Sequence, residues 1–213
     1  MNYLITWFYG ESKDNESFYP SVGGNTSSPE FHQVYWKCIY DFFRSAILTN
    51  EAEISYKFFT NVPNIPTEID GVNLQQFFDS NGVEVTQLEL SKKMPPDWYG
   101  AWRNQLYEFD ILKELSKVPG NCYLILDSDI LIRKKMTPVF DEIKENGAIC
   151  YECGYGLSNG INGISIVQMR SLYDEIYQGG GTALSYYGGE FIGVTSKIAS
   201  KLVDEFDFLW NEN

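Results

Sequence analysis

The sequence of 213 residues predicts one α/β domain, spanning residues 1–213, in which a central sheet is flanked by helices. Three observations support this fold class. Short apolar runs rich in β-branched and aromatic residues alternate with segments of helical periodicity. A hydrophobic fraction of 44% is enough for a substantial core. The apolar run at residues 123–126 leads directly into two aspartates, as a buried strand does when it ends at a ligand site.

In the first half of the chain, strands and helices alternate regularly. The expected strands are residues 3–9, 54–60 and 83–90, and the expected helices are residues 31–48 and 74–79. This order is that of right-handed βαβ units. Between the first strand and the first helix, residues 11–29 are rich in Ser, Asn, Gly and Pro. A loop of that length in a compact domain is expected to be functional, as a lid or an acceptor loop.

The second half continues the alternation and adds glycine-rich connections. The expected helices are residues 101–117, 137–145, 171–177 and 196–210, and the expected strands are residues 123–126, 148–153 and 162–167. Thr137-Pro138 starts one of these helices and Gly147 ends it. Residues 187–193 bring Glu190 between glycines and apolar residues, so that backbone and substrate can approach closely.

Composition excludes several classes of partner. Sixteen basic and 29 acidic residues give a net charge of −13, which repels nucleic acid and anionic membranes. The sequence contains no apolar run of roughly 18 to 20 residues and no basic amino terminus followed by an apolar core, so we expect a cytoplasmic protein without a membrane segment. The four cysteines are too scattered for a disulfide framework. The one histidine, His32, is interpreted as a surface or capping residue.

The strongest functional signal is the pair Asp127 and Asp129. In extended backbone, residues two apart point the same way, so both carboxylates could reach one Mg²⁺ or Mn²⁺. Such an incompletely caged metal keeps coordination sites free for substrate phosphates. A solvated acidic turn would have the same spacing, but here apolar runs stand on both sides, and unpaired buried charge is costly. The sequence therefore predicts a divalent metal at these two aspartates.

This segment resembles the D-x-D region of GT-A glycosyltransferases, in which an apolar strand delivers Asp-x-Asp to the metal and diphosphate of a nucleotide-sugar. The resemblance implies a GT-A fold with a mixed central sheet and a metal-dependent glycosyltransferase of hexosyltransferase type. It also implies Mn²⁺ or Mg²⁺, a nucleotide-sugar donor that we expect to be UDP-linked, and a saccharide or other hydroxyl acceptor. Ser128, between the two aspartates, would lie against the donor.

The same resemblance implies roles for residues outside the motif. Trp7 and Tyr9, at the end of the first strand, would stack on the nucleotide base or pack in the core. Arg103 stands in a first helical turn, where the helix dipole disfavours a cation, and would bind the diphosphate. Asn162 would contact the donor sugar. Glu190 would bind sugar hydroxyls or act as a base on the acceptor side, and Asp129 would contribute to catalysis through the metal.

Two alternatives and one departure stay open. A phosphatase of the haloacid-dehalogenase type would use Asp127 as nucleophile, although that family expects its motif near the first strand and Thr or Val where Leu131 stands. A non-catalytic sugar- or nucleotide-binding domain would bind without turnover. Many GT-A enzymes provide a third metal ligand late in the chain, often His or Asp, and no late histidine exists here. Either two aspartates, diphosphate and water hold the metal, or a C-terminal segment is missing, or metal binding is degraded.

Overall fold

A computed structural model of the protein describes residues 1–17, 19, 25–50, 53–95, 102–161, 163–177 and 185–211. Its centre is a six-stranded sheet in the order β3-β2-β1-β4-β8-β5. The strands are β1 (Asn2–Phe8), β2 (Ile54–Thr60), β3 (Val83–Gln87), β4 (Cys122–Leu126), β5 (Ala148–Glu152) and β8 (Tyr187–Thr195). Strands β3, β2, β1 and β4 are mutually parallel, and β8 runs antiparallel to both β4 and β5. The expected mixed central sheet is confirmed.

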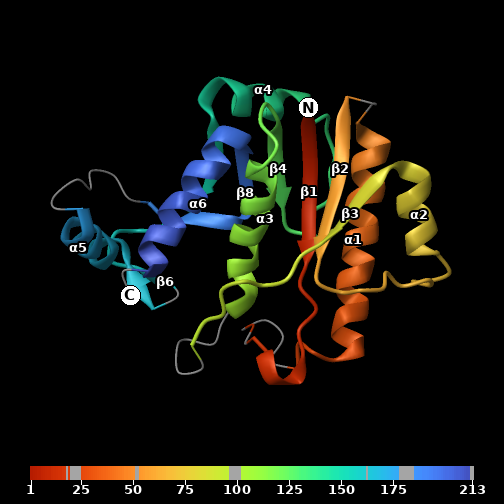
Figure 1. The fold of residues 1–213 in the computed structure, drawn as a ribbon, viewed down its shortest axis with the longest axis horizontal. Coiled ribbons are helices and arrows are strands. Elements are labelled where there is room, and N and C mark those ends of the chain that lie inside the picture. Colours follow the sequence, from red (N-terminus) through yellow and green to blue (C-terminus); the bar gives the residue numbers. More distant parts are fainter. Residues whose placement is uncertain are drawn as a thin grey trace.

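Helices cover both faces of the sheet (Figure 1). On one face, α3 (Tyr107–Ser116) and α6 (Ser196–Asn211) enclose a core cluster with Ile5, Tyr123 and Ile125. On the other face, α1 (Pro29–Thr49), α2 (Leu74–Asn81) and α4 (Thr137–Asn146) enclose a second cluster with Leu4, Phe8 and Leu124. Consecutive residues of β1 and β4 thus enter opposite clusters, because strand side chains alternate between the two faces of a sheet.

Local sequence signals account for the ends of the helices. The Ser28 hydroxyl accepts a hydrogen bond from the Phe31 backbone N–H at 3.1 Å, and Pro29 occupies the first turn of α1. Gly82 ends α2 in the left-handed conformation, at φ 66°. The helix expected at residues 31–48 begins two residues earlier, at Pro29, and the helix expected at residues 74–79 is two residues longer at its carboxyl end.

Two expected boundaries differ in the structure. Residues 103–106 form a 3₁₀ turn, η2 (Arg103–Leu106), before α3 begins, and residue 101 lies outside the described residues. The strand expected at residues 162–167 is shorter: within the described residues 163–167 only β7 (Ile164–Ser165) is extended, and it pairs with β6 (Gly160–Ile161). Helix α5 (Ile166–Tyr177) starts five residues before the predicted position. The reason is a reciprocal capping box, in which Ser165 N donates to Gln168 Oε1 at 2.8 Å and Gln168 N donates to Ser165 Oγ at 3.2 Å.

Strand β8 is the element that the sequence interpretation missed. Its residues were read as a glycine-flexed segment, yet they form a nine-residue strand between β4 and β5. The strands expected at residues 83–90 and 148–153 are shorter and end at Gln87 and Glu152. No helix in the described part of the chain is long and apolar enough to cross a membrane.

Candidate functional site

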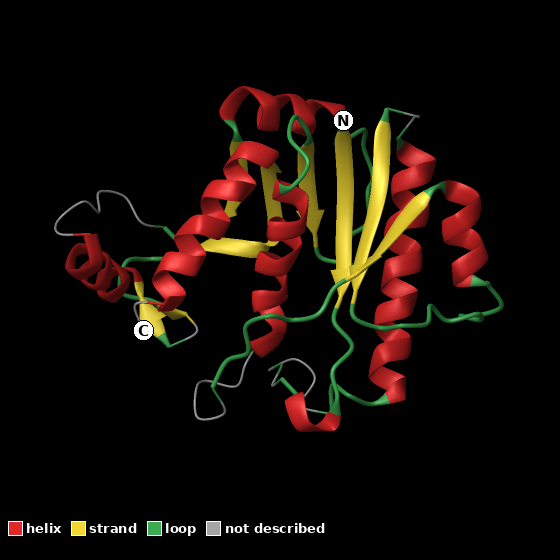
Figure 2. Cartoon of the chain, in the orientation of Figure 1, coloured by secondary structure: helices red, strands yellow, loops and turns green. Residues whose placement is uncertain are grey.

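The candidate site lies at the edge of the sheet where the parallel strands end. Strands β1 and β4 end there, and β8 begins there because it runs the opposite way. This topology sets Glu190 beside Asp127, whose backbone N–H donates to the Glu190 carbonyl oxygen at 3.2 Å. Figure 2 shows loops gathered beyond the same edge. Carboxyl ends of strands are where open α/β sheets bind ligands.

Asp127, Ser128 and Asp129 follow β4 directly, but the second and third of them form a turn and not extended backbone. Ser128 is buried, Asp127 is half-buried and Asp129 is exposed. The two carboxylates nevertheless influence each other. Burial raises the pKa of Asp127 to about 6, and the charges of Asp129 and Glu190 add to the effect. The three carboxylates therefore form one negatively charged region.

This turn exists because the chain reverses direction after the motif. Residues 130–136 run back over the α1 face of the sheet and are held by the carboxyl end of α1. Ile132 N donates to the Ser45 hydroxyl at 3.0 Å, and the Ile132 carbonyl accepts from the Thr49 hydroxyl at 2.9 Å. The apolar run after the motif thus packs on a helix instead of forming a strand.

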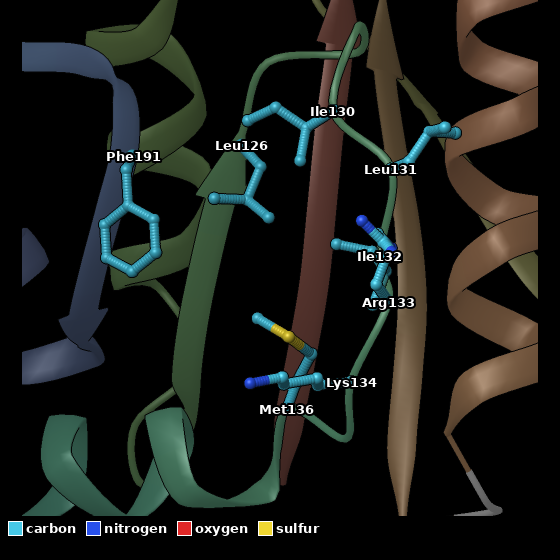
Figure 3. A pocket seen from close by; sticks show the side chains of 8 residues that line it. All are labelled: Leu126, Ile130, Leu131, Ile132, Arg133, Lys134, Met136 and Phe191. Carbon is cyan, nitrogen blue, oxygen red and sulfur yellow. The ribbon is translucent and has the colours of Figure 1, made fainter.

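A hollow lies under this returning segment and not at the carboxylates. It has a volume of about 500 Å³. Figure 3 shows Leu126 and Phe191 on the sheet side, with Ile130, Ile132 and Met136 on the returning segment. Its lining contains no carboxylate, and only Arg133 and Lys134 bring charge to it. Such a lining suits apolar packing and offers no chemistry for group transfer.

Glu108 is the site residue that the sequence interpretation missed. It belongs to the first turn of α3, is only 5% exposed, and accepts a hydrogen bond from Trp7 Nε1 at 3.2 Å. Burial, together with the nearby charges of Asp127 and Glu190, raises the pKa of Glu108 to about 8. At neutral pH this carboxyl is mostly protonated. In the sequence, Glu108 stands on the same helix face as Ile111, Leu112 and Leu115, a position that does not distinguish it from an ordinary acidic residue of a first helical turn.

Trp7 and Tyr9 lie on the α3 side of β1, and both rings contact the ring of Tyr107, at centroid distances of 5.7 and 5.3 Å. Phe8 alternates to the other side and is core, 3% exposed. Tyr9 and Arg103 line a small cleft of about 30 Å³ with Lys93. Arg103 Nη2 donates to the Pro95 carbonyl at 2.8 Å. The cleft therefore brings two cations to the edge of a strongly acidic protein.

A buried polar network organises the loop after β1. The carboxylate of Glu11 accepts hydrogen bonds from Ser17 N at 2.6 Å, from the Thr26 hydroxyl and from Asn104 Nδ2. Asn104 Nδ2 also donates to the Ser17 hydroxyl at 3.1 Å, and all four residues are buried. Since Asn104 follows Arg103 directly, this network fixes the loop and the Arg103 cleft relative to each other.

The remaining predicted residues can be placed briefly. Asn162 lies outside the described residues. His32 is half-buried against Phe8, with ring centroids 5.2 Å apart, and burial lowers its pKa. Burial also raises the pKa of Tyr35, one turn later in α1, to about 12, and the charges of Asp127 and Asp129 contribute. The carboxylates therefore lie between the amino-terminal turns of α1 and α3.

The donor set fits a hard cation held by few protein ligands. Asp127 and Asp129 provide carboxylate oxygens, the ligands that Mg²⁺ and Mn²⁺ prefer, in a region where carboxylates repel one another. Among the described residues, no group of three or more His, Cys, Asp or Glu side chains is arranged to hold a metal. These residues are therefore compatible with a metal that is held by two aspartates and completes its coordination with water and substrate oxygens.

Comparisons with known proteins give a structural likeness without a sequence relationship. No protein-family model matches the sequence, and no curated protein matches it. The structure resembles the galactosyltransferase LgtC, solved with donor and acceptor sugar analogs, with a TM-score of 0.50 and 12% identity over 92% of this chain and 58% of that one. It also resembles the bifunctional glycosyltransferase WbbM, with a TM-score of 0.54 and 9% identity over 96% of this chain and 32% of that one. The fold is of the GT-A type. The chain spans less than two thirds of the length of either protein, and at these identities the likeness concerns the fold alone.

Proposed function

We propose that this protein is a metal-dependent glycosyltransferase that moves a sugar from a nucleotide-diphosphate donor, with UDP as the expected nucleotide, to a saccharide or other hydroxyl acceptor. The observation that carries the proposal is the group of carboxylates at the carboxyl edge of a GT-A-type sheet, where Asp127 follows β4 and Glu190 lies beside it on β8. The same edge has a cationic cleft lined by Arg103 and Lys93. An acidic pair for a metal and cations for phosphate at one edge of the sheet suit an anionic donor in a protein of net charge −13.

The reaction transfers the sugar between two oxygens. The acceptor hydroxyl oxygen forms a bond to the anomeric carbon, and the bond from that carbon to the diphosphate oxygen breaks. The diphosphate leaves with the electron pair, and the acceptor proton goes to a base or to the leaving group. When bound by Asp127 and Asp129, the metal would act as a Lewis acid on the leaving diphosphate.

The residues of this chain divide the remaining work. Arg103 would bind diphosphate oxygens, and Tyr9 would pack against the nucleotide base. Glu190 would orient the acceptor hydroxyl and, in an inverting enzyme, take its proton. Trp7 is hydrogen-bonded to Glu108 and packed on Tyr107, so it would form part of the floor of the site.

The alternatives have less support. A phosphatase with Asp127 as nucleophile would carry its motif near the first strand, whereas Asp127 follows β4 of a GT-A-type sheet. A non-catalytic sugar- or nucleotide-binding domain would use the same aspartates and cations without turnover, so it needs no base on the acceptor side. Neither the buried acid Glu108 nor the carboxylate of Glu190 beside Asp127 is needed for binding alone.

Calorimetry with UDP, with and without Mn²⁺, tests the proposal. We expect UDP binding that depends on Mn²⁺, and slow release of UDP from one member of a panel of UDP-sugars. Asp129→Asn removes a charge from the metal site, so UDP affinity and turnover should fall together. Glu142→Gln, on the exposed side of α4, is the matched control and should behave as the parent. Equal UDP binding with and without Mn²⁺, or an Asp129→Asn variant with parental Mn²⁺ and UDP binding, would refute the proposal.

A further inference from the structure

Near Glu190, the neighbouring strand β5 carries an exposed aromatic side chain. Tyr151 of β5 lies directly across the ladder from Gly188, and its side chain is 55% exposed. Directly opposite residues of an antiparallel pair point to the same face, with Cβ atoms about 4.5 to 5.5 Å apart. Since Gly188 has no side chain, nothing from that position covers the Tyr151 ring.

Glu190 occupies the space that Gly188 leaves. A Cβ atom on residue 188 would collide with the Glu190 carboxylate, so this carboxylate folds back over the glycine. The pairing of β5 with β8 shifts register between Cys150 and Tyr151, so alternation along β8 does not decide which face Glu190 takes. The contact decides it, because the Glu190 carboxylate lies on the Cβ side of Gly188, the residue that pairs with Tyr151. An exposed aromatic ring and a carboxylate therefore lie next to each other on one surface.

The order of the strands gives this surface its place relative to the metal site. From β4 to β8 to β5, the sheet presents Asp127, then Glu190 with Gly188, then Tyr151. Tyr151 lies two strands away from β4, and because it pairs with Gly188 and not with Glu190, it is also displaced along the sheet from Asp127. A donor sugar whose diphosphate is held at Asp127 would thus occupy the space over β8, and a second sugar would reach Tyr151.

We propose that Tyr151 is the stacking platform of an acceptor-saccharide subsite, in which Glu190 binds a hydroxyl of the sugar that lies on the ring. The chemistry suits a pyranose: its C–H face is weakly positive and matches the negative face of an aromatic ring, and its hydroxyls donate to a carboxylate. A small number of polar groups beside an aromatic surface is typical of small-molecule sites. This inference rests on the proposed glycosyl transfer, and it narrows the acceptor from any hydroxyl compound to a saccharide.

The same pair of strands offers a matched control. Tyr187 lies across from Glu152 and is 58% exposed, much like Tyr151. Because it is the next residue along the ladder, its side chain points to the opposite face. Replacing either tyrosine by alanine removes the same exposed ring, but only Tyr151 shares a surface with Glu190.

The test measures binding of methyl β-D-glucopyranoside, methyl β-D-galactopyranoside, methyl α-D-mannopyranoside and lactose by saturation-transfer NMR, with UDP and Mn²⁺ present. We expect at least one saccharide to bind the parent. Tyr151→Ala should weaken its binding by about 2- to 12-fold, the range for loss of one aromatic contact. Tyr151→Phe should stay within about twofold of the parent, as should Tyr187→Ala, while all variants keep the parental melting temperature and UDP affinity.

The outcomes separate this inference from the proposed function. If the protein binds UDP with Mn²⁺ but binds none of the four saccharides, or if Tyr187→Ala weakens binding as much as Tyr151→Ala, the Tyr151 subsite is wrong and the proposed transfer stands. If a saccharide binds through Tyr151 but UDP binding does not depend on Mn²⁺, the subsite stands and the proposed donor chemistry is wrong.

Discussion

Glu108→Gln should stabilise the metal-free protein, and the gain should grow as pH rises. Glu108 is buried and its pKa in the folded state is raised to about 8, whereas in the unfolded chain it has its ordinary value of 4.5. Folding therefore favours the protonated form. The stability that this proton contributes is fully present below pH 4.5 and is lost as pH rises towards 8. Glutamine keeps the size of the side chain and an oxygen that can accept from Trp7 Nε1, and it has no proton to lose.

The magnitude follows from the two pKa values. Between pH 5 and 7 the folded form keeps its proton while the unfolded form has lost it, so each pH unit lowers the free energy of unfolding by about 1.4 kcal/mol. The accumulated penalty is roughly 1 kcal/mol at pH 5 and roughly 3 kcal/mol at pH 7. For a domain of this size, about 3 kcal/mol corresponds to a melting temperature higher by roughly 6 to 12 °C.

Thermal unfolding in buffer with a chelator, at pH 5, 6, 7 and 8, checks this prediction. The melting temperatures of parent and Glu108→Gln should diverge steadily with pH. Glu142→Gln, an exposed carboxylate of α4, is the control and should follow the parent throughout. Asp127 also titrates in this range, and its charge helps to raise the pKa of Glu108, so the difference between the two proteins reports the coupled pair and not Glu108 alone. A difference between parent and Glu108→Gln that does not change from pH 5 to pH 8 would refute the buried-acid interpretation.

Two further predictions concern the same edge of the sheet. Glu190→Gln keeps the shape and hydrogen bonding of the side chain but removes its basicity. In an inverting enzyme, sugar transfer should therefore fall about 100- to 10,000-fold, while UDP binding with Mn²⁺ stays near the parental value. Sugar transfer at the parental rate would exclude Glu190 as the base. Asn104→Ala leaves buried partners in the Glu11 network unsatisfied and should cost about 1 to 3 kcal/mol, a drop in melting temperature of roughly 2 to 12 °C. An unchanged melting temperature would show that the network does not stabilise the loop.

The elements that could be predicted are those whose structure follows from neighbouring residues in the sequence. Strands β1, β2 and β4 are runs of apolar and β-branched residues, and α1 and α2 have caps and apolar periodicity that stand in the sequence itself. The position of Asp127 at the end of a buried strand was predictable for the same reason. The spacing of Ser165 and Gln168 also stands in the sequence, but the strand predicted from the isoleucines on either side of Ser165 did not take it into account.

Glu108 shows what local patterns cannot supply. Its neighbours along α3 indicate only an amphipathic helix with an acidic first turn, which is common because carboxylates there suit the helix dipole. Its burial arises from contacts with distant parts of the chain, since Trp7 lies 101 residues earlier and β8 lies about 80 residues later. Gly189 permits that approach, because a Cβ at this position would lie 2.9 Å from Gln105 Nε2 on the turn before α3.

Strand β8 explains why Glu190 could be suspected from sequence but not positioned. Its glycines give it low intrinsic strand propensity, so no local signal predicts a strand. It forms because β4 and β5 leave room for one strand between them, and Phe191, Ile192 and Val194 fill the two cores on either side of the sheet. Only the antiparallel direction brings the beginning of this strand to the edge where β4 ends. A parallel strand in the same slot would have put Glu190 near the opposite edge, so the pairing of Asp127 with Glu190 is a consequence of topology and not of either residue's own surroundings in the sequence.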